Sequence, residues 1–281
     1  MKKSLLCVLM ACVFLLTSCA TASLSGGKGV GRVKQYDFYS YDVPKAFDGF
    51  KIGFASDFHF ESRFTRKRLS QLVKTMQNLK TDVLLLGGDY LGRNGGNIDT
   101  LFSEVSRVKT PYGIYGVMGN HEWKTKEVHD RVVASMEKFG IVPMQNEAYR
   151  LVKGDSSLII CGIKDPFDLK HNTPSISEGF DSKEFVVLVT HTPDYVEDTS
   201  VSNANLALAG HTHGGQVSIF HSYTPAHFSK YGNRFLTGWK ENSQGVPIII
   251  TNGIGTSRKD IRLFTPSEVV LIVLHRVEKQ L

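Results

Sequence analysis

The sequence predicts an α/β domain built on mixed β-sheets, and two patterns carry this prediction. Short apolar runs rich in β-branched residues alternate with longer segments whose apolar residues recur at helical spacing, as in buried strands and the helices that cover them. In the second half of the chain, strand-like runs follow one another more directly, which favours mixed sheets. The predicted strands are Lys51 to Ala55, Asp82 to Leu86, Tyr112 to Met118, Leu158 to Ile163, Phe185 to Thr190, Leu206 to Ala209, Pro247 to Thr251 and Glu268 to Leu274.

Two helices are predicted between the first strands. The segments Arg66 to Leu79 and Lys126 to Phe139 place apolar residues three and four positions apart, which gives each helix one apolar face. The strand–helix–strand order therefore predicts a sheet whose faces are covered.

The first 18 residues have the pattern of a secretory signal peptide. Lys2 and Lys3 precede a nearly continuous apolar run from Leu5 to Leu16, shorter than the roughly 20 residues that a membrane-spanning helix needs. The run ends in Leu16-Thr17-Ser18-Cys19, which resembles the lipoprotein box of bacteria, where the cysteine is acylated and becomes the first residue. A cleaved signal peptide that happens to contain Cys19 is the alternative.

The signal divides the chain into three parts: the signal peptide at 1–18, a tether of small and polar residues at 19–33, and one catalytic domain at 34–281. We expect the tether to be flexible, and acyl chains on Cys19 would hold the protein on a membrane without spanning it. The expected location is the bacterial cell envelope, facing outside the cytoplasm. Cys161 lies in an apolar run of the domain and is expected to be a buried thiol.

The charge of the chain favours anionic partners. The net charge is +6, and removal of Lys2 and Lys3 with the signal would leave 6 − 2 = +4. This value suits a phosphorylated substrate or an anionic membrane. Because the basic residues are dispersed, the sequence gives no strong signal for nucleic acid.

Five of the predicted strands end in side chains that bind metals. Asp57 and His59 follow the first strand, and His211 and His213 follow Leu206 to Ala209. In an extended segment, residues two apart point the same way, so each pair could hold one ion. The remaining strand-end ligands are Asp89, Asn120 and His191.

Each motif alone has an ordinary explanation as a turn or a satisfied polar group, but five in succession favour a metal centre. Ligands of open α/β sheets collect where the carboxyl ends of the strands emerge. Gly87 and Gly88 before Asp89 would let the backbone approach a crowded centre, and a carboxylate such as Asp89 can bridge two cations.

These motifs resemble those of the calcineurin-like metallophosphoesterases. The matching segments, in the order of that family, are Asp57-x-His59, Gly88-Asp89, Gly119-Asn120-His121-Glu122, His191 and Gly210-His211-Thr212-His213. The resemblance extends from about Lys34 to the C-terminus. The segments Ala209 to Gln216 and Gly253 to Ser257 are similar to a branch of bacterial membrane-associated phosphodiesterases that includes hydrolases of UDP-2,3-diacylglucosamine.

The resemblance implies a fold, a ligand set and a reaction. The fold would be a sandwich of two mixed β-sheets flanked by helices (αββα). Asp57, His59 and His213 would hold one divalent ion, and Asn120, His191 and His211 the other, with Asp89 bridging them. A hydroxide bridging the ions would attack phosphorus. His121 would protonate the leaving group or stabilise the transition state.

The implied cofactors are two divalent ions. Oxygen and nitrogen ligands without a thiolate suit manganese, iron or zinc, and we favour manganese. The expected substrate is a phosphodiester or pyrophosphate that is lipid-linked or part of a nucleotide, such as a nucleotide sugar. A phosphomonoesterase or nuclease with the same centre is the alternative. A non-catalytic binding module is a further alternative that would predict lost ligands.

Three weaker features remain open on sequence alone. Arg93 could contact a phosphate, although a solvated loop arginine explains it equally well. Arg262 could face the pocket, while solvation at a strand edge is the simpler explanation. The segment 217–242 combines aromatic and basic residues beside the predicted metals, where it could shape substrate access or pack on the domain.

Overall fold

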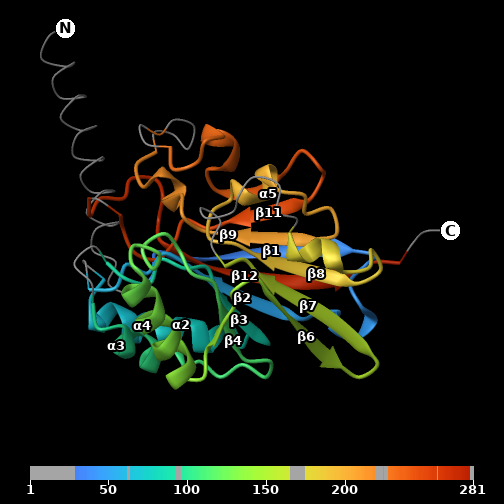
Figure 1. Cartoon of the computed structure of the whole chain (residues 1–281), viewed down its shortest axis with the longest axis horizontal. Helices are drawn as coiled ribbons and strands as arrows, with labels where there is room; N and C mark the ends of the chain where they lie inside the picture. Colours follow the sequence, from blue (N-terminus) through green and yellow to red (C-terminus); the bar gives the residue numbers. More distant parts are fainter. Residues whose placement is uncertain are drawn as a thin grey trace, which may run out of the picture.

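Two six-stranded β-sheets form the centre of the fold (Figure 1). The computed structural model describes residues 29–61, 64–92, 96–164, 175–218, 224, 227–257 and 259–278. The first sheet has the order β1 (Arg32–Ser40), β12 (Glu268–Arg276), β2 (Lys51–Ala55), β3 (Val83–Leu86), β4 (Ile114–Gly116) and β5 (Val142–Pro143). The second has the order β10 (Gly238–Glu241), β11 (Pro247–Ile250), β9 (Leu206–Ala209), β8 (Phe185–Val189), β7 (Ser156–Gly162) and β6 (Glu147–Lys153).

Both sheets are mixed, as predicted. In the first sheet, β12 is antiparallel to β2 and all other pairs are parallel. In the second sheet, the two outermost pairs, β10 with β11 and β6 with β7, are antiparallel.

The apolar residues form three layers of core that define a helix–sheet–sheet–helix sandwich. The central layer lies between the sheets and includes Phe54, Leu85, Ile160 and Val187. A second layer packs α2 (Arg66–Leu79), α3 (Ile98–Val105) and α4 (Lys126–Lys138) on the first sheet, and a third packs α5 (Tyr195–Asp198) on the second. Figure 1 shows α5 on the opposite side of the strands from α2, α3 and α4. The αββα architecture is therefore confirmed.

The two predicted helices begin and end for local reasons. The Thr65 hydroxyl accepts the backbone N–H of Arg68 at the start of α2, and Lys80 ends it in the left-handed conformation. The Thr125 hydroxyl caps α4 in the same way. Because a capping hydroxyl satisfies an otherwise orphaned N–H group, each cap fixes where the helix starts. The short 3₁₀ helices are η1 (Lys45–Phe47), η2 (Ile176–Gly179), η3 (His213–Gly215) and η4 (Gly232–Phe235).

The N-terminal boundary differs from the expectation. Strand β1 begins at Arg32, within the range assigned to the tether, and Val30 before it is 9% exposed. The predicted signal peptide and Cys19 lie outside the described residues. None of the described helices is long and apolar enough to cross a membrane.

Candidate metal centre

The predicted ligands come together at one edge of the sandwich, which we call the ligand edge: the side where β2, β3, β4, β8 and β9 end. The first sheet supplies Asp57, His59, Asp89 and Asn120, and the second supplies His191, His211 and His213. The ligands lie in the loops just after their strands, except His213, which begins η3. The centre therefore sits at the seam between the two sheets.

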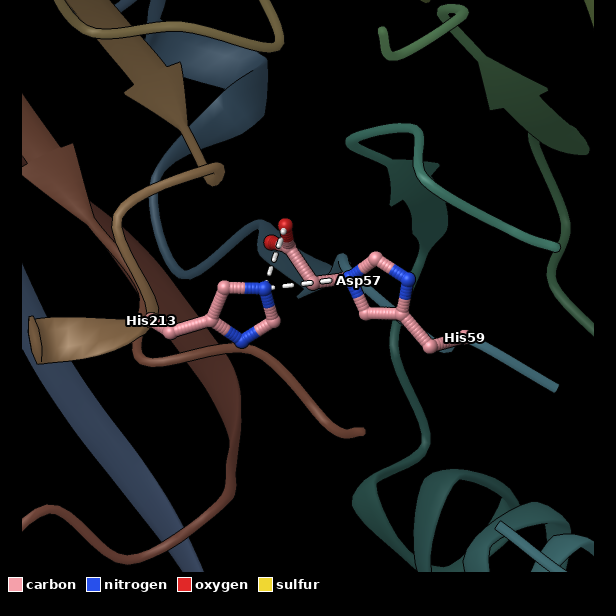
Figure 2. A group of neighbouring side chains, drawn as sticks. All are labelled: Asp57, His59 and His213. Atoms are coloured by element: carbon pink, nitrogen blue, oxygen red, sulfur yellow. Dashed lines mark hydrogen bonds and ion pairs between the residues drawn. The ribbon is translucent and has the colours of Figure 1, made fainter. Parts of the chain in front are cut away.

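The first group of ligands is Asp57, His59 and His213 (Figure 2). The Nε2 atoms of His59 and His213 are 3.0 Å apart, and His213 Nε2 lies 3.5 Å from Asp57 Oδ1. Burial lowers the pKa of His59 to about 4 and that of His213 well below its usual range. Two neutral imidazoles and a carboxylate that face one another at this spacing are suited to a shared cation.

The second group is Asn120, His191 and His211. His191 Nε2 lies 3.2 Å from both Asn120 Oδ1 and His211 Nδ1. Burial works to lower the pKa of His191, but the carboxylates of Asp89 and Asp57 outweigh it and raise the pKa to about 10. The carboxylates thus create a strong local demand for positive charge, which a divalent ion would satisfy.

Asp89 lies between the two groups. Its Oδ2 is 3.6 Å from His59 Nε2 in the first group, and its Oδ1 is 3.4 Å from His191 Nε2 in the second. One carboxylate oxygen thus faces each group, which is the arrangement that a bridging ligand requires.

The histidine nitrogens are oriented by hydrogen bonds behind them. His191 Nδ1 donates to the Gly87 carbonyl at 2.7 Å, and His59 Nδ1 lies 3.3 Å from the Leu91 carbonyl. A carbonyl only accepts, so these contacts assign the proton to Nδ1 and leave Nε2 free to bind a metal. The donor set of both groups therefore fits two divalent ions.

The backbone of the ligands corrects our explanation for their pairing. Asp57, His59, Asp89, His211 and His213 all have positive φ values, between 43° and 70°. They do not converge as alternate residues of an extended strand. Left-handed backbone is uncommon outside glycine and costs of order 1–3 kcal/mol per residue, so five instances in one centre indicate a functional constraint.

Two glycines make room for this backbone. A side chain on Gly119 would collide with the Asp89 carboxylate, and one on Gly88 would meet the backbone of Gly119 at 2.5 Å. Gly88 also has φ +90°. The close approach expected for the glycine pair before Asp89 is present at Gly88.

Glu122 is a buried carboxylate behind the centre, included in a family motif of the sequence analysis but without an assigned role. It is 0% exposed. Its oxygens accept four backbone N–H groups, from Asp89 (2.9 Å), Tyr90 (3.0 Å), Leu91 (3.3 Å) and Gly119 (2.9 Å). Burial and the charge of Asp89 raise its pKa to about 8. Glu122 thus fixes the loops after β3 and β4 to each other, and its place two residues after Asn120 was the available signal.

Arg262 is also buried behind the centre, so the strand-edge solvation that we considered is wrong. It is 6% exposed, and its Nη2 lies 3.3 Å from His213 Nδ1. Its guanidinium donates to the carbonyls of His213, Asn252, Gly253, Gly255 and Thr265. Burial lowers its pKa to about 10. Arg262 therefore remains a cation at neutral pH and holds the 252–255 loop beside His213.

A cavity of about 300 Å³ opens onto the centre. It is lined by Asp89, Asn120, His121, Lys124, His211, His213, Phe228 and Ser257. His121 Nδ1 lies 3.1 Å from the Leu91 carbonyl, which directs Nε2 towards Asp89 Oδ2 at 3.9 Å. His121 also lies close to the ligands, since one of its ring nitrogens is within 4.8 Å of a ring nitrogen of His59 and of a carboxylate oxygen of Asp89.

Of the remaining sequence predictions, some are confirmed and one falls outside the described residues. Cys161 is a buried free thiol, as expected. Arg93 lies outside the described residues, so its phosphate contact stays a prediction. In the segment 217–242, Phe228 lines the cavity, whereas Phe235 is buried in the core and Trp239 stacks on Phe38. Packing on the domain therefore explains Phe235 and Trp239. Phe228, in contrast, is placed where it could shape access to the cavity.

Comparison with known proteins finds metallophosphoesterases among the relatives of this chain. An uncharacterized metallophosphoesterase of Aquifex aeolicus (strain VF5) is 28% identical over 249 residues, covering 86% of this chain and 91% of that protein. The uncharacterized metallophosphoesterase YkuE of Bacillus subtilis (strain 168) is 27% identical over 278 residues, covering 91% and 93%. Among solved structures, NAD nucleotidase of Haemophilus influenzae is similar with 14% identity and a TM-score of 0.45, covering 73% of this chain and 50% of that chain.

The family profile covers the part of the chain that carries the ligands. The profile described as calcineurin-like phosphoesterase matches residues 50–215. This range is more than half of the chain and runs from the start of β2 past His213. The chain therefore belongs to the calcineurin-like phosphoesterase family.

Proposed function

We propose that this metallophosphoesterase hydrolyses phosphodiesters or pyrophosphates that are lipid-linked or contain a nucleotide. The observation that carries the proposal is the position of Asp89, with one oxygen towards each of two complete ligand groups beneath an open cavity. When bound, two divalent ions would supply Lewis acidity at the phosphoryl group and lower the pKa of a water. Ligands that are nitrogens and oxygens without a thiolate suit manganese, iron or zinc, and of these we favour manganese.

The side chains around the cavity would divide the remaining tasks. His121 presents Nε2 to the cavity and is held there through Nδ1, so it can pass a proton to the leaving oxygen. Lys124 places a cation on the cavity wall, with its Nζ 3.5 Å from His121 Nδ1. An ammonium at this place would bind a non-bridging phosphate oxygen.

Phe228 at the cavity wall supports a substrate that extends beyond the phosphoryl group. A cavity of about 300 Å³ lies at the lower end of the range of ligand pockets, about 300–1,000 Å³, and accommodates a phosphoryl group and its nearest substituents. The rest of a diester would extend outwards past the Phe228 ring, which offers a face to a base, a sugar or an acyl chain.

The test compares a generic aryl phosphodiester with the matching aryl phosphomonoester, with and without Mn²⁺. We expect wild-type hydrolysis of the diester to need the metal, and Asp89→Ala to abolish it. Activity that survives both chelation and Asp89→Ala would contradict the two-metal centre. Equal rates on the two esters would assign the centre to a phosphomonoesterase as well.

We also propose that the mature chain is anchored in the cell envelope through acyl chains on Cys19. The support is the Leu16 to Cys19 sequence and the short apolar run before it. Cys19→Ser should move the protein from the detergent phase to the aqueous phase in a partition assay. Persistent partition into detergent would exclude the acyl anchor.

A further inference from the structure

The chain enters the folded domain at the ligand edge. Strand β1 runs parallel to β12, with Arg32 opposite Glu268, and β12 runs antiparallel to β2, with Val270 opposite Phe54. The first residue of β1 therefore lies at the end of the sheet where β2 leads into Asp57.

Specific contacts connect this entry point to the metal centre. The Gly31 N–H donates to the Ser267 hydroxyl at 2.9 Å, and Arg32 donates to Glu268 Oε2 at 2.7 Å. The other oxygen of Glu268 accepts the Asn252 N–H at 3.0 Å. Gly253, the next residue of that loop, lies so close to Asp57 that an added side chain would collide with the Asp57 side chain. These contacts therefore connect the start of the domain to the metal centre.

The length of chain before this point limits how the domain can face a membrane. Cys19 and Gly29 are 29 − 19 = 10 residues apart, a distance of at most about 35 Å even when fully extended. A domain of about 250 residues is roughly 45 Å across, so the path around it to the opposite edge is roughly 70 Å. An anchor at Cys19 therefore cannot bring the opposite edge to the bilayer.

The surface around the entry point has a composition that suits an anionic bilayer. Arg66 and Lys67 are exposed in the first turn of α2, which contains no acidic residue. Cations at a helix N-terminus oppose the macrodipole at about 0.3–1 kcal/mol each, and an external anion would offset this cost. Arg66 has an exposed partner, Glu61, at 3.6 Å, while Lys67 has no ion pair among the described residues.

An exposed apolar residue lies in a loop that also carries an exposed lysine. Ile261 is 48% exposed, and Lys259 in the same loop is also exposed. The loop borders the cavity through Ser257. A large apolar side chain among cations is typical of residues that enter the lipid headgroup region.

From the entry point, the tether length and this surface, we infer that the ligand edge rests on an anionic lipid bilayer, with Arg66, Lys67 and Lys259 at the headgroups and Ile261 inserted among them. The cavity would then open towards the lipid surface. This orientation rests on the Cys19 anchor proposed above and not on hydrolytic activity.

The test places an environment-sensitive NBD fluorophore at either edge of the processed, membrane-purified full chain. The variants are Ile261→Cys at the ligand edge and Val152→Cys, a 60% exposed residue at the opposite edge, in β6. In vesicles of phosphatidylglycerol and phosphatidylcholine, we expect the emission at 261 to shift to shorter wavelength and to be quenched by nitroxide-labelled lipid. The emission wavelength of the fluorophore at position 152 should stay at its value in detergent-free buffer. The chain without an added cysteine gives the background.

Charge reversal tests the cations separately. Arg66→Glu with Lys67→Glu should remove most of the shift at 261, whereas Lys45→Glu with Lys183→Glu makes the same change of charge at exposed residues of the opposite edge and should not. A shift at 152, equal shifts at both positions, or no shift at 261 in anchored protein would overturn the orientation. Hydrolysis of a soluble aryl diester should be unchanged in all four variants. If the wild type did not hydrolyse the diester, the proposed reaction would be contradicted, while the fluorescence result on the orientation would remain valid.

Discussion

At the scale of single residues, the metal centre combines strained backbone with oriented donors. Five ligands hold left-handed backbone conformations, and hydrogen bonds from behind fix which nitrogen of His59 and His191 faces inwards. Strain of this kind persists only when the surroundings hold it in place. Glu122 is the residue that secures the most backbone around Asp89, because four N–H groups converge on it.

Glu122→Gln should therefore weaken the centre without removing a ligand. A glutamine presents one NH₂ group, which would face two backbone N–H donors in either orientation. We expect metal affinity or activity to fall about 10- to 100-fold, measured as the Mn²⁺ dependence of diester hydrolysis. Glu127→Gln, on the exposed surface of α4, is the matched control. An unchanged Mn²⁺ dependence would show that Glu122 serves stability alone.

Lys124 should act on the substrate and not on the metals. Lys124→Ala removes the only lysine that lines the described cavity, so KM for an aryl phosphodiester should rise about tenfold, a loss of about 1.4 kcal/mol. Its metal content should stay that of the wild type. Lys126→Ala removes a nearby exposed lysine that pairs with Asp130 and should leave KM unchanged. Equal effects in both variants would indicate general loss of charge instead of a specific contact.

The sequence predicts which residues are ligands better than it predicts the backbone geometry that brings them together. Strand-end spacing brought Asp57, Asp89 and the distal histidines to notice, and the structure places all seven together. The left-handed backbone was not predictable, because it depends on what packs against each loop. The burial of Arg262 was not predictable for a similar reason: its partners are main-chain carbonyls, which no side-chain pattern reveals.

At the scale of elements, the sheet interior was predictable and its borders were not. All eight predicted strands are interior strands of the two sheets, while β1, β5, β6 and β10, which the prediction missed, are the four edge strands. An edge strand is partly solvated, so polar residues interrupt its apolar pattern, as in the alternating burial of β1. The helices α3 and α5 were missed because they span only 8 and 4 residues.

Cys161 provides a test of the packing of β7. It lies in the core layer with Tyr195 and Val196 of α5, and burial raises its pKa to about 12. The thiol should therefore stay protonated and unreactive throughout the neutral and mildly alkaline range. Iodoacetamide at pH 8 should alkylate Cys161 only when guanidinium is present. The alkylation is measured by mass spectrometry of the peptide that contains Cys161. Rapid alkylation without denaturant would show that α5 does not cover β7 stably.

At the scale of the whole molecule, the centre links the two sheets. Each ligand group takes residues from both sheets: His59 and His213 are 154 positions apart, and Asn120 and His191 are 71 apart. Ions bound here would oppose separation of the sheets and would offset the mutual repulsion of Asp57 and Asp89.

Metal binding should therefore raise thermal stability. With free Mn²⁺ at 100 times its Kd, the native state gains about 2.7 kcal/mol, which raises Tm by roughly 5 to 10 °C in a domain of this size. The measurement is thermal unfolding after dialysis against EDTA, with and without Mn²⁺ added back. Asp89→Ala should show a much smaller rise, and an equal rise would locate the stabilising ion elsewhere.

The seam position of the ligands also sets an order of assembly. Neither sheet holds a complete ligand group, so a chain with only one sheet formed offers ions a few separate histidines and carboxylates. Tight capture requires that β8 and β9 have already docked against β2 and β3. The metals therefore cannot direct early folding. Their uptake marks a finished domain, and a chain that stalls before docking would remain metal-free even where the ion is plentiful.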